Sequence, residues 1–368
     1  RVLMIKDVAI SRVTWVSAGA GGALEETVKN AFTLALGEGS AANVSLGYLN
    51  GTLTTSGDKV YQITNTIGTK INLNGVYNSG ATLPSGNLNY QGDIWMDISG
   101  GAFGIISGGV TNEWSTKLQT STLTGDTHVQ LSGDATAEHV IGGNNKGAST
   151  TLTGNTNVTV KDNAIVAGAI IGASTSAHNA VTTITGNTSV LVTNVQYSNT
   201  AQNLDGGLSN SYIIGGSSWS SNTTSGTTIQ GSTSATINLN GITLSGTEKH
   251  NSFVKTIIGG SYGNVNNAGT VNNINGDTSV SIIGREGITF TGDIIGGSFE
   301  NSGQAQYTIG GKSSISISGG STFTGNIYGG FYSKVPGNTG STMTTAGNIT
   351  VELGTGTYRG NIYGAGNK

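Results

Sequence analysis

The sequence predicts an all-β fold, a single-stranded parallel β-helix in which about eight regular coils stack along one axis. Three observations support this prediction. Of the 368 residues, 61 are Gly, only 2 are Pro and none is Cys. Two short motifs alternate eight times along the chain, and each carries apolar residues at strand spacing. Because glycine makes up only ~7% of an average protein, this excess indicates a repeat architecture with many tight corners.

The first motif reads Φ-x-G-(D/N)-x-x-Φ-x-Φ, where Φ is apolar, and it is clearest in Leu152 to Val160 (LTGNTNVTV). The residues four and six after its glycine are apolar, which predicts a strand with one buried face. The preceding Gly-Asp or Gly-Asn pair is typical of a tight bend. Its glycine stands at Gly92, Gly125, Gly154, Gly186, Gly231, Gly276, Gly311 and Gly347.

The second motif reads aromatic-T-G-(D/N)-I-(I/Y)-G-G and is clearest in Phe290 to Gly297 and Phe323 to Gly330. The residue two before its first closing glycine is β-branched and apolar in all eight copies, as a buried strand requires. The first closing glycines are Gly108, Gly142, Gly172, Gly215, Gly259, Gly296, Gly329 and Gly364.

One such unit cannot bury its own apolar side, but stacked units give each strand a parallel partner about 4.8 Å above and below. We therefore expect one coil per unit, wound right-handed because that is the default crossover for parallel strands. Units as short as 29 residues leave little room for the four antiparallel strands of a propeller blade. The chain divides into residues 90–368, with the eight repeats, and residues 1–89, which lack both motifs.

The N-terminal segment 1–89 is expected to be a cap with one or two degenerate coils. Residues 24–36 (LEETVKNAFTLAL) have apolar residues every fourth position, which predicts one short helix. This helix would cover the exposed core of the first coil. The chain does not begin with Met and stops directly after the eighth second motif, so we expect it to be a piece of a longer protein.

The composition excludes several classes of protein. The net charge is −3 and only 10% of the residues are charged, so a nucleic-acid partner is not expected. No run of about 18 apolar residues predicts a membrane span. Without Cys, a disulfide framework cannot form.

The IIGGS and NIYGG coils, the TGNTxVxV strands and the richness in Gly, Asn, Ser and Thr resemble the right-handed β-helix passenger domains of bacterial autotransporters and related surface adhesins. The resemblance covers roughly residues 90–368. It implies a location outside the cell or on the bacterial outer surface. It also implies an adhesin or structural stalk that binds a glycan or protein of a host or neighbouring cell through exposed loops and the flank of the rod.

The main alternative class is a carbohydrate-active enzyme, a polysaccharide lyase or glycosidase, because such enzymes also use β-helices. The strongest candidates for paired carboxylates are Asp93 and Asp126, which stacking would place one above the other. Asp and Asn at a bend more often cap their own backbone, and the following units supply Asn or Ser. We therefore predict no catalytic residue, no metal site and no cofactor, and a protein that is not an enzyme.

The aromatic residues provide the candidate binding site. Tyr262, Phe299 and Tyr332 follow the second-motif glycine by three residues in successive units. Phe331 directly precedes Tyr332, and Trp219 lies one position off the equivalent place in an earlier unit. They form either a packing stack or a strip that binds sugar rings or a partner protein. A second series, Phe253, Phe290, Phe323 and Tyr358, is predicted to stack in the interior.

The sequence thus favours a non-enzymatic adhesin or stalk. A carbohydrate-active enzyme is one alternative, and the other is a subunit of a fibre or sheath that assembles through the coil ends. Self-association is therefore among the expected interactions.

Overall fold

A computed structural model describes most of the repeat region and parts of the N-terminal segment. The described residues are 13–14, 44–45, 58–64, 70–76, 86–110, 118–145, 149–162, 164–176, 181–193, 212–220, 226–241, 252–264, 270–301, 305–334 and 342–366. All of the regular elements within these ranges are strands. The helix predicted over residues 24–36 lies outside them.

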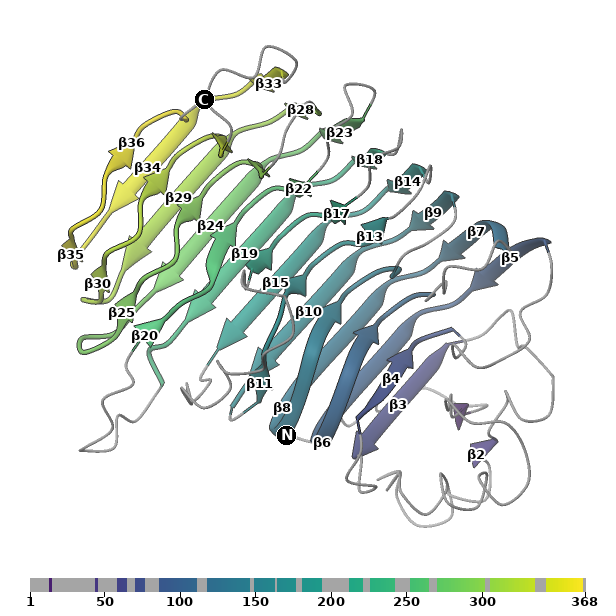
Figure 1. Cartoon of the computed structure of the whole chain (residues 1–368). Coiled ribbons are helices and arrows are strands. Elements are labelled where there is room, and N and C mark those ends of the chain that lie inside the picture. Colours follow the sequence, from purple (N-terminus) through teal and green to yellow (C-terminus); the bar gives the residue numbers. More distant parts are fainter. Residues whose placement is uncertain are drawn as a thin grey trace.

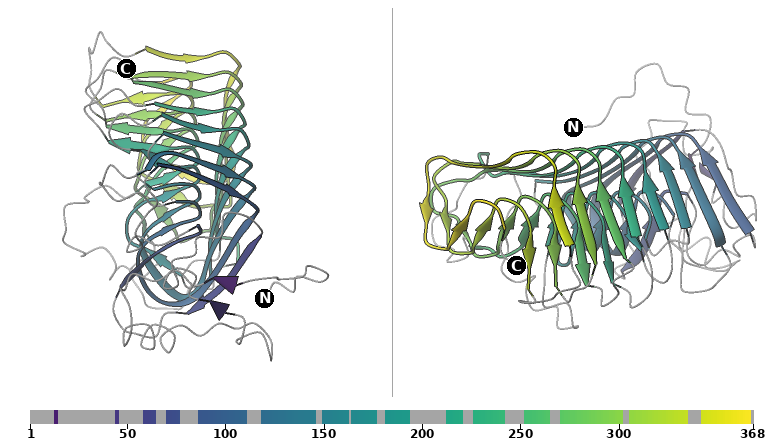
Figure 2. Two further views of the ribbon diagram at one scale, coloured as in Figure 1. Left: turned by 90° about the vertical axis from the view of Figure 1, so that its right-hand side faces the viewer. Right: turned by 90° about the horizontal axis from the view of Figure 1, so that it is seen from above.

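Every strand pair is parallel, and the strands stack coil upon coil along one axis (Figures 1 and 2). The predicted all-β parallel β-helix is therefore confirmed. Its strands fall into five columns, A to E, in the order in which the chain meets them within each coil. The right-handed winding and the division at residue 89 stay predictions.

Columns A and B carry the first motif. Column A consists of β5 (Gly86–Gln91), β7 (Leu118–Thr124), β9 (Ser149–Thr153), β14 (Val181–Ile184), β18 (Gly226–Ile229), β23 (Val271–Ile274), β28 (Gln306–Ile309) and β33 (Thr342–Thr345). Column B consists of β3 (Lys59–Thr64), the first parts of β6 (Ile94–Ser107) and β8 (Thr127–Ile141), then β10 (Thr156–Lys161), β15 (Thr188–Thr193), β19 (Thr233–Asn238), β24 (Thr278–Ile283), β29 (Ser313–Ser318) and β34 (Ile349–Leu353).

The second motif forms columns C and D, and its Gly-Gly pair leads into column E. Column C consists of β20 (Ser252–Phe253), β25 (Thr289–Phe290), β30 (Thr322–Phe323) and β35 (Thr357–Tyr358). Column D consists of β4 (Ile71–Asn74), the last parts of β6 and β8, then β12 (Ile170–Ile171), β16 (Tyr212–Ile214), β21 (Thr256–Ile258), β26 (Ile294–Ile295), β31 (Ile327–Tyr328) and β36 (Ile362–Tyr363). Column E consists of β13 (Thr175–Ser176), β17 (Ser218–Ser220), β22 (Tyr262–Asn264), β27 (Phe299–Glu300) and β32 (Tyr332–Ser333).

The remaining strands lie outside these columns. β11 (Ile165–Val166) pairs with the middle of β8, and β1 (Val13–Thr14) pairs with β2 (Val44–Ser45). β3 and β4 pair with β6, so the stack begins one coil before the first complete copy of the repeat.

The first-motif glycine turns the chain from column A to column B. Gly92, Gly125 and Gly154 have φ angles of 146°, 140° and 150°, a conformation that residues with a Cβ rarely adopt. A Cβ at Gly125 would also collide with the carbonyl oxygen of Gly92 in the preceding coil. At these three corners the backbone conformation requires glycine, and at Gly125 the close approach of successive coils requires it as well.

One continuous hydrophobic core runs along the inside of the coils. In column B, Val160, Val192 and Ile237 stack in register and are nearly inaccessible to solvent. The predicted interior aromatic series is confirmed. Phe253, Phe290, Phe323 and Tyr358 pair coil by coil, with ring centroids 4.8, 4.9 and 5.2 Å apart.

In five of the column B strands, β8, β10, β15, β19 and β29, a buried hydroxyl at the start of the strand ties the two motifs together across the interior. Thr188 and Thr233 donate hydrogen bonds to the carbonyl oxygens of Gly215 and Gly259 at 2.5 and 2.6 Å. Thr127, Thr156 and Ser313 make the same bond to the first closing glycine of the second motif in their own units, Gly142, Gly172 and Gly329. Thr278 lies in register with Thr233, yet its Oγ1 has no partner among the described residues.

Thr233 and Thr278 occupy the same position in adjacent coils, but only the Thr233 hydroxyl donates a hydrogen bond, so substitutions at the two residues can be compared directly. Thr233→Val removes a buried hydrogen bond and leaves the Gly259 carbonyl without its donor, so we expect the free energy of unfolding to fall by about 1 kcal/mol. Thr278→Val removes a hydroxyl that donates no bond, so it should leave stability unchanged or raise it. Urea unfolding of both variants measures the difference, and equal losses would contradict the role given to the Thr233 hydroxyl.

Candidate functional site

Four of the candidate binding residues, Trp219, Tyr262, Phe299 and Tyr332, lie on column E, and Phe331 directly precedes β32 of that column. Tyr262, Phe299 and Tyr332 pair directly in successive coils, as their spacing predicts. Their ring centroids are 5.4 and 5.1 Å apart. Phe299 is buried, whereas Tyr262 and Tyr332 are partly exposed.

The outward-facing residues of column D help to form an apolar cluster on the outside of the coil. Alternate residues of a strand point to opposite faces, so Ile294 and Ile327 enter the main core while the next residues, Ile295 and Tyr328, point the other way. These outward residues pack against the column E aromatics as a second apolar cluster. In the Ile-Ile or Ile-Tyr pair of the second motif, the first residue therefore packs in the main core and the second packs in the outer apolar cluster.

We define the aromatic strip as Tyr262, Phe299, Tyr332, Tyr328 and Tyr363. Tyr328 stacks on Tyr332 with centroids 4.3 Å apart and on Tyr363 with centroids 4.9 Å apart, and the latter planes differ by 1°. Tyr363 is also partly exposed. The strip thus ends in a stack of rings with nearly parallel planes, an arrangement in which aromatic side chains attract one another.

The structure does not bring Phe331 into this strip. Phe331 turns to the opposite side of the chain from Tyr332 and packs with Ala305, Tyr307 and Ile309. Alternation along an extended chain accounts for this, since neighbouring residues face opposite ways. The backbone of Trp219 pairs with Gly263, one position away from Tyr262, and its side chain lies outside the described part of the structure.

Tyr212 belongs to the same apolar cluster, although no motif in the sequence indicated this. It comes from column D, yet its ring centroid lies 4.5 Å from that of Tyr262. Burial raises the pKa of Tyr212, and the neighbouring Tyr262 adds to this shift. The two hydroxyls therefore stay protonated at ordinary pH and can donate hydrogen bonds.

The bend residues after the first-motif glycine form a ladder between coils. Oδ1 of Asp93 accepts a hydrogen bond from the Asp126 amide at 2.8 Å, and Oδ1 of Asp126 accepts one from the Asn155 amide at 2.7 Å. The ladder continues through Asn187, Ser232 and Asp277 to the amide of Lys312. The prediction that these residues cap their own backbone is wrong, because each side chain instead binds the backbone of the next coil.

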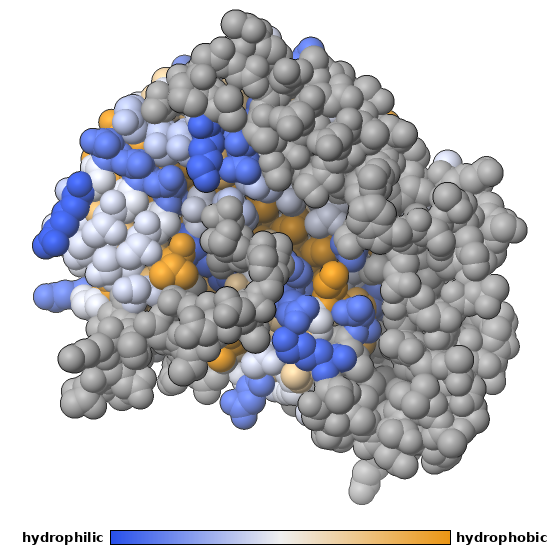
Figure 3. Space-filling model, viewed as in Figure 1, coloured by the Kyte–Doolittle hydropathy of each residue, from blue (hydrophilic) through white to orange (hydrophobic). Residues whose placement is uncertain are grey.

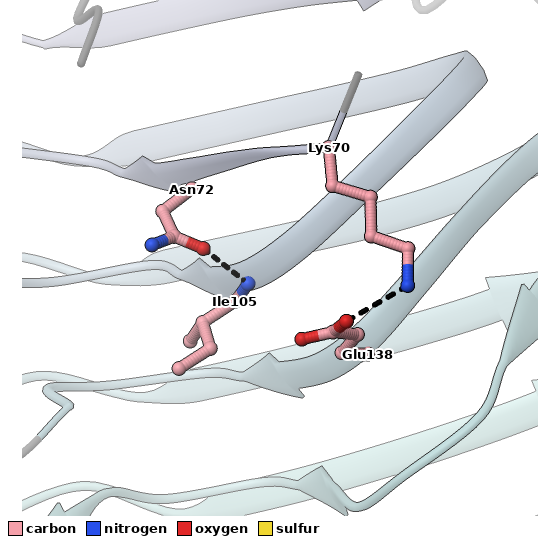
Figure 4. Close-up of polar contacts among 4 residues, drawn as sticks. All are labelled: Lys70, Asn72, Ile105 and Glu138. Carbon is pink, nitrogen blue, oxygen red and sulfur yellow. Dashed lines mark hydrogen bonds and ion pairs between the residues drawn. The ribbon is translucent and has the colours of Figure 1, made fainter. Parts of the chain in front are cut away.

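A similar contact lies within column D, where Oδ1 of Asn72 in β4 accepts a hydrogen bond from the Ile105 amide of β6 at 2.8 Å (Figure 4). Beside it, Nζ of Lys70 lies 2.8 Å from Oε1 of Glu138, two coils further along (Figure 4). Both of these charged side chains are more than 40% exposed, so the ion pair contributes little to stability. The Asn72 hydrogen bond, by contrast, links adjacent coils directly.

The histidines described by the structure also make contacts between coils. His128 stacks on Trp95 with centroids 3.6 Å apart, and burial lowers its pKa. Nδ1 of His139 accepts a hydrogen bond from the Ala169 amide. Within the described ranges no group of three or more His, Cys, Asp or Glu residues is arranged to hold a metal ion.

Two buried ionisable residues were missed by sequence reasoning. Lys255 donates from Nζ to the carbonyl oxygens of Gly168 at 2.6 Å and Ala167 at 3.3 Å, two coils earlier in the stack. Glu300 is fully buried, and its Oε1 accepts a hydrogen bond from the Ala305 amide. Neither residue recurs at its position in other units, so no repeat pattern indicated its burial.

Comparisons with protein families, curated proteins and solved structures gave no match. No described helix is long and apolar enough to cross a membrane.

The buried lysine makes stability depend on pH in a defined window. Burial lowers the pKa of Lys255 to about 7, against roughly 10.4 in an unfolded chain. Between these values the unfolded state binds more protons than the folded state, so stability rises with pH by up to about 1.4 kcal/mol per unit. Lys255→Met should remove this part of the slope in urea unfolding between pH 7 and 9.5.

Lys312→Met provides the matched control, because that side chain is exposed. We expect it to keep the wild-type slope. A Lys255→Met protein with an unchanged slope would show that this amine is not responsible for the pH dependence.

Proposed function

We propose that this chain is the rod of a bacterial surface or secreted protein and acts as an adhesin or structural stalk without catalytic activity of its own. The partner is a glycan or protein on a host or neighbouring cell. The observation that carries the proposal is the aromatic strip, which runs along the outside of the coils and leaves Tyr262, Tyr332 and Tyr363 partly exposed.

A rod that repeats the same surface along its length is better suited to binding a ligand than to catalysing a reaction. Successive coils present side chains at about 4.8 Å intervals, so a linear ligand can contact several equivalent positions at once. Tyrosine offers an apolar ring and a hydroxyl together, which favours both sugar rings and protein surfaces. In the view of Figure 3, hydrophobic residues gather in parts of the surface and are bordered by hydrophilic ones.

The two carboxylates whose spacing best suits catalysis also support a non-catalytic function. Asp93 and Asp126 lie in adjacent coils, as paired carboxylates would, but each is engaged by a backbone amide of the next coil. Their arrangement is the one expected of residues that hold a stack of coils together. The proposal therefore assigns them a structural role.

Binding to immobilised glycans and to host or bacterial cells tests the proposal. We expect the wild-type chain to bind, and Tyr332→Ala to weaken binding about fivefold because a stacked ring contributes roughly 1 kcal/mol. Tyr332→Phe keeps the ring and should retain most of the binding. Thr308→Ala, an exposed change on column A, is the matched control and should bind as wild type.

Thermal unfolding of each variant establishes that the coils are intact. The proposal would be contradicted by a folded wild-type chain that binds none of the glycans or cells, or by a Tyr332→Ala variant that binds as tightly as wild type.

A further inference from the structure

We propose that two tyrosine pairs on the outside of the coils, Tyr212–Tyr262 and Tyr328–Tyr332, are sites of oxidative cross-linking to dityrosine. Each pair joins a residue of column D to a residue of column E. The co-reactant is a one-electron oxidant, such as a haem peroxidase supplied with hydrogen peroxide. The new bond would fasten column E, whose strands are only two or three residues long, to the body of the rod.

The rings of both pairs lie in contact. The centroids of Tyr212 and Tyr262 are 4.5 Å apart, and those of Tyr328 and Tyr332 are 4.3 Å apart. The ring planes differ by 31° in the first pair and by 10° in the second. Two rings at this separation face one another. The lobes of their ortho carbons, which share the unpaired electron of a tyrosyl radical, therefore point toward the partner ring.

A hydrogen bond between the hydroxyls adds a second contact in each pair. The Tyr212 hydroxyl donates to that of Tyr262, and the Tyr328 hydroxyl donates to that of Tyr332. The ortho carbons are direct neighbours of the carbon that carries the hydroxyl, so this bond aligns the edges of the rings that must couple. Burial raises the pKa of both donor tyrosines, which therefore keep their phenolic protons at ordinary pH.

In each pair one ring is accessible and the other is buried. Tyr262 and Tyr332 are partly exposed, whereas Tyr212 is 8% exposed and Tyr328 is 3% exposed. An oxidant in solution therefore reaches Tyr262 and Tyr332 first. Because the buried hydroxyl donates its hydrogen bond to the accessible one, it can pass its hydrogen atom along this bond to a radical on the accessible ring.

The cross-link needs two one-electron oxidations. In the first pair, Tyr262 gives an electron to the oxidant and its phenolic proton to water, and its radical then takes the hydrogen atom of the Tyr212 hydroxyl. A second oxidation of Tyr262 leaves one radical on each ring. The two radicals form a carbon–carbon bond between ortho carbons, and the hydrogen on each of these carbons moves to the phenolic oxygen. Two electrons and two protons leave in total, and both phenols are restored.

The surroundings of the pairs favour coupling over other fates of the radicals. Cys reduces tyrosyl radicals readily, and the chain contains none. The described members of the outer apolar cluster are Ile, Ala, Phe and Tyr residues, so this cluster includes neither Trp nor Met. Phe299 lies between Tyr262 and Tyr332 and carries no hydroxyl, so hydrogen atoms cannot pass through it from one pair to the other. The two pairs should therefore react independently.

Peptide mapping after oxidation of the full chain with a haem peroxidase and hydrogen peroxide tests the proposal. Digestion with trypsin and an aspartate-specific protease places Tyr212 in residues 205–249 and Tyr262 in residues 256–276, and neither fragment contains another tyrosine. We expect these two fragments to be joined with the loss of two hydrogen atoms. We also expect residues 313–334, which contain both Tyr328 and Tyr332, to lose two hydrogen atoms within one fragment.

Tyr262→Phe and Tyr332→Phe serve as matched controls for each other, because each keeps its ring and removes one hydroxyl. Tyr262→Phe should lose the cross-link to Tyr212 and keep the one between Tyr328 and Tyr332, and Tyr332→Phe should do the reverse. The cross-link that remains shows that the coils of each variant are folded. Absence of dityrosine from the folded wild-type chain, cross-links mainly at other tyrosines, or equal yields in urea-unfolded protein would each overturn the proposal.

Discussion

The structure depends on the hydrogen-bonded, in-register stacking of parallel coils. Each strand pairs with the equivalent strand of the next coil, so a residue meets its counterpart from the following repeat at about 4.8 Å. Like residues then form ladders along the axis: Thr beside Thr, Phe beside Phe, Asp or Asn beside Asn. A corner that must pass this close to its neighbour admits only glycine, which explains the unusual composition.

The stacking of the coils also determines which way each side chain points and what it contacts. Column D residues alternate between the interior core and an outer apolar cluster, and the outer cluster places the aromatic strip along the flank of the rod. The bend residues use their oxygens to bind the amide of the next coil and so reinforce the stack.

The coil architecture and the interior aromatic series could be predicted because they repeat. Phe290 and Phe323 occur at the same distance before the first closing glycine of the second motif. Because the coils stack in register, this equal spacing brings the two rings into contact. The direction of Phe331 could not be taken from its closeness to Tyr332 in the sequence, since adjacent residues of an extended chain face opposite sides. Lys255 could not be predicted either, because its partners, the carbonyls of Ala167 and Gly168, lie two coils away and about 87 residues earlier.

Disulfide formation between engineered cysteine pairs tests the in-register stacking most directly. Ser234 and Ser279 are paired residues of β19 and β24, so their Cα atoms should be about 4.8 Å apart, within the roughly 4.4–6.8 Å that a disulfide spans. Ser234 and Ser281 are offset by two residues, which places their Cα atoms roughly 8 Å apart. The account predicts rapid oxidation of the Ser234→Cys, Ser279→Cys protein and little oxidation of the Ser234→Cys, Ser281→Cys protein. The reverse order, or equal oxidation of both, would contradict it.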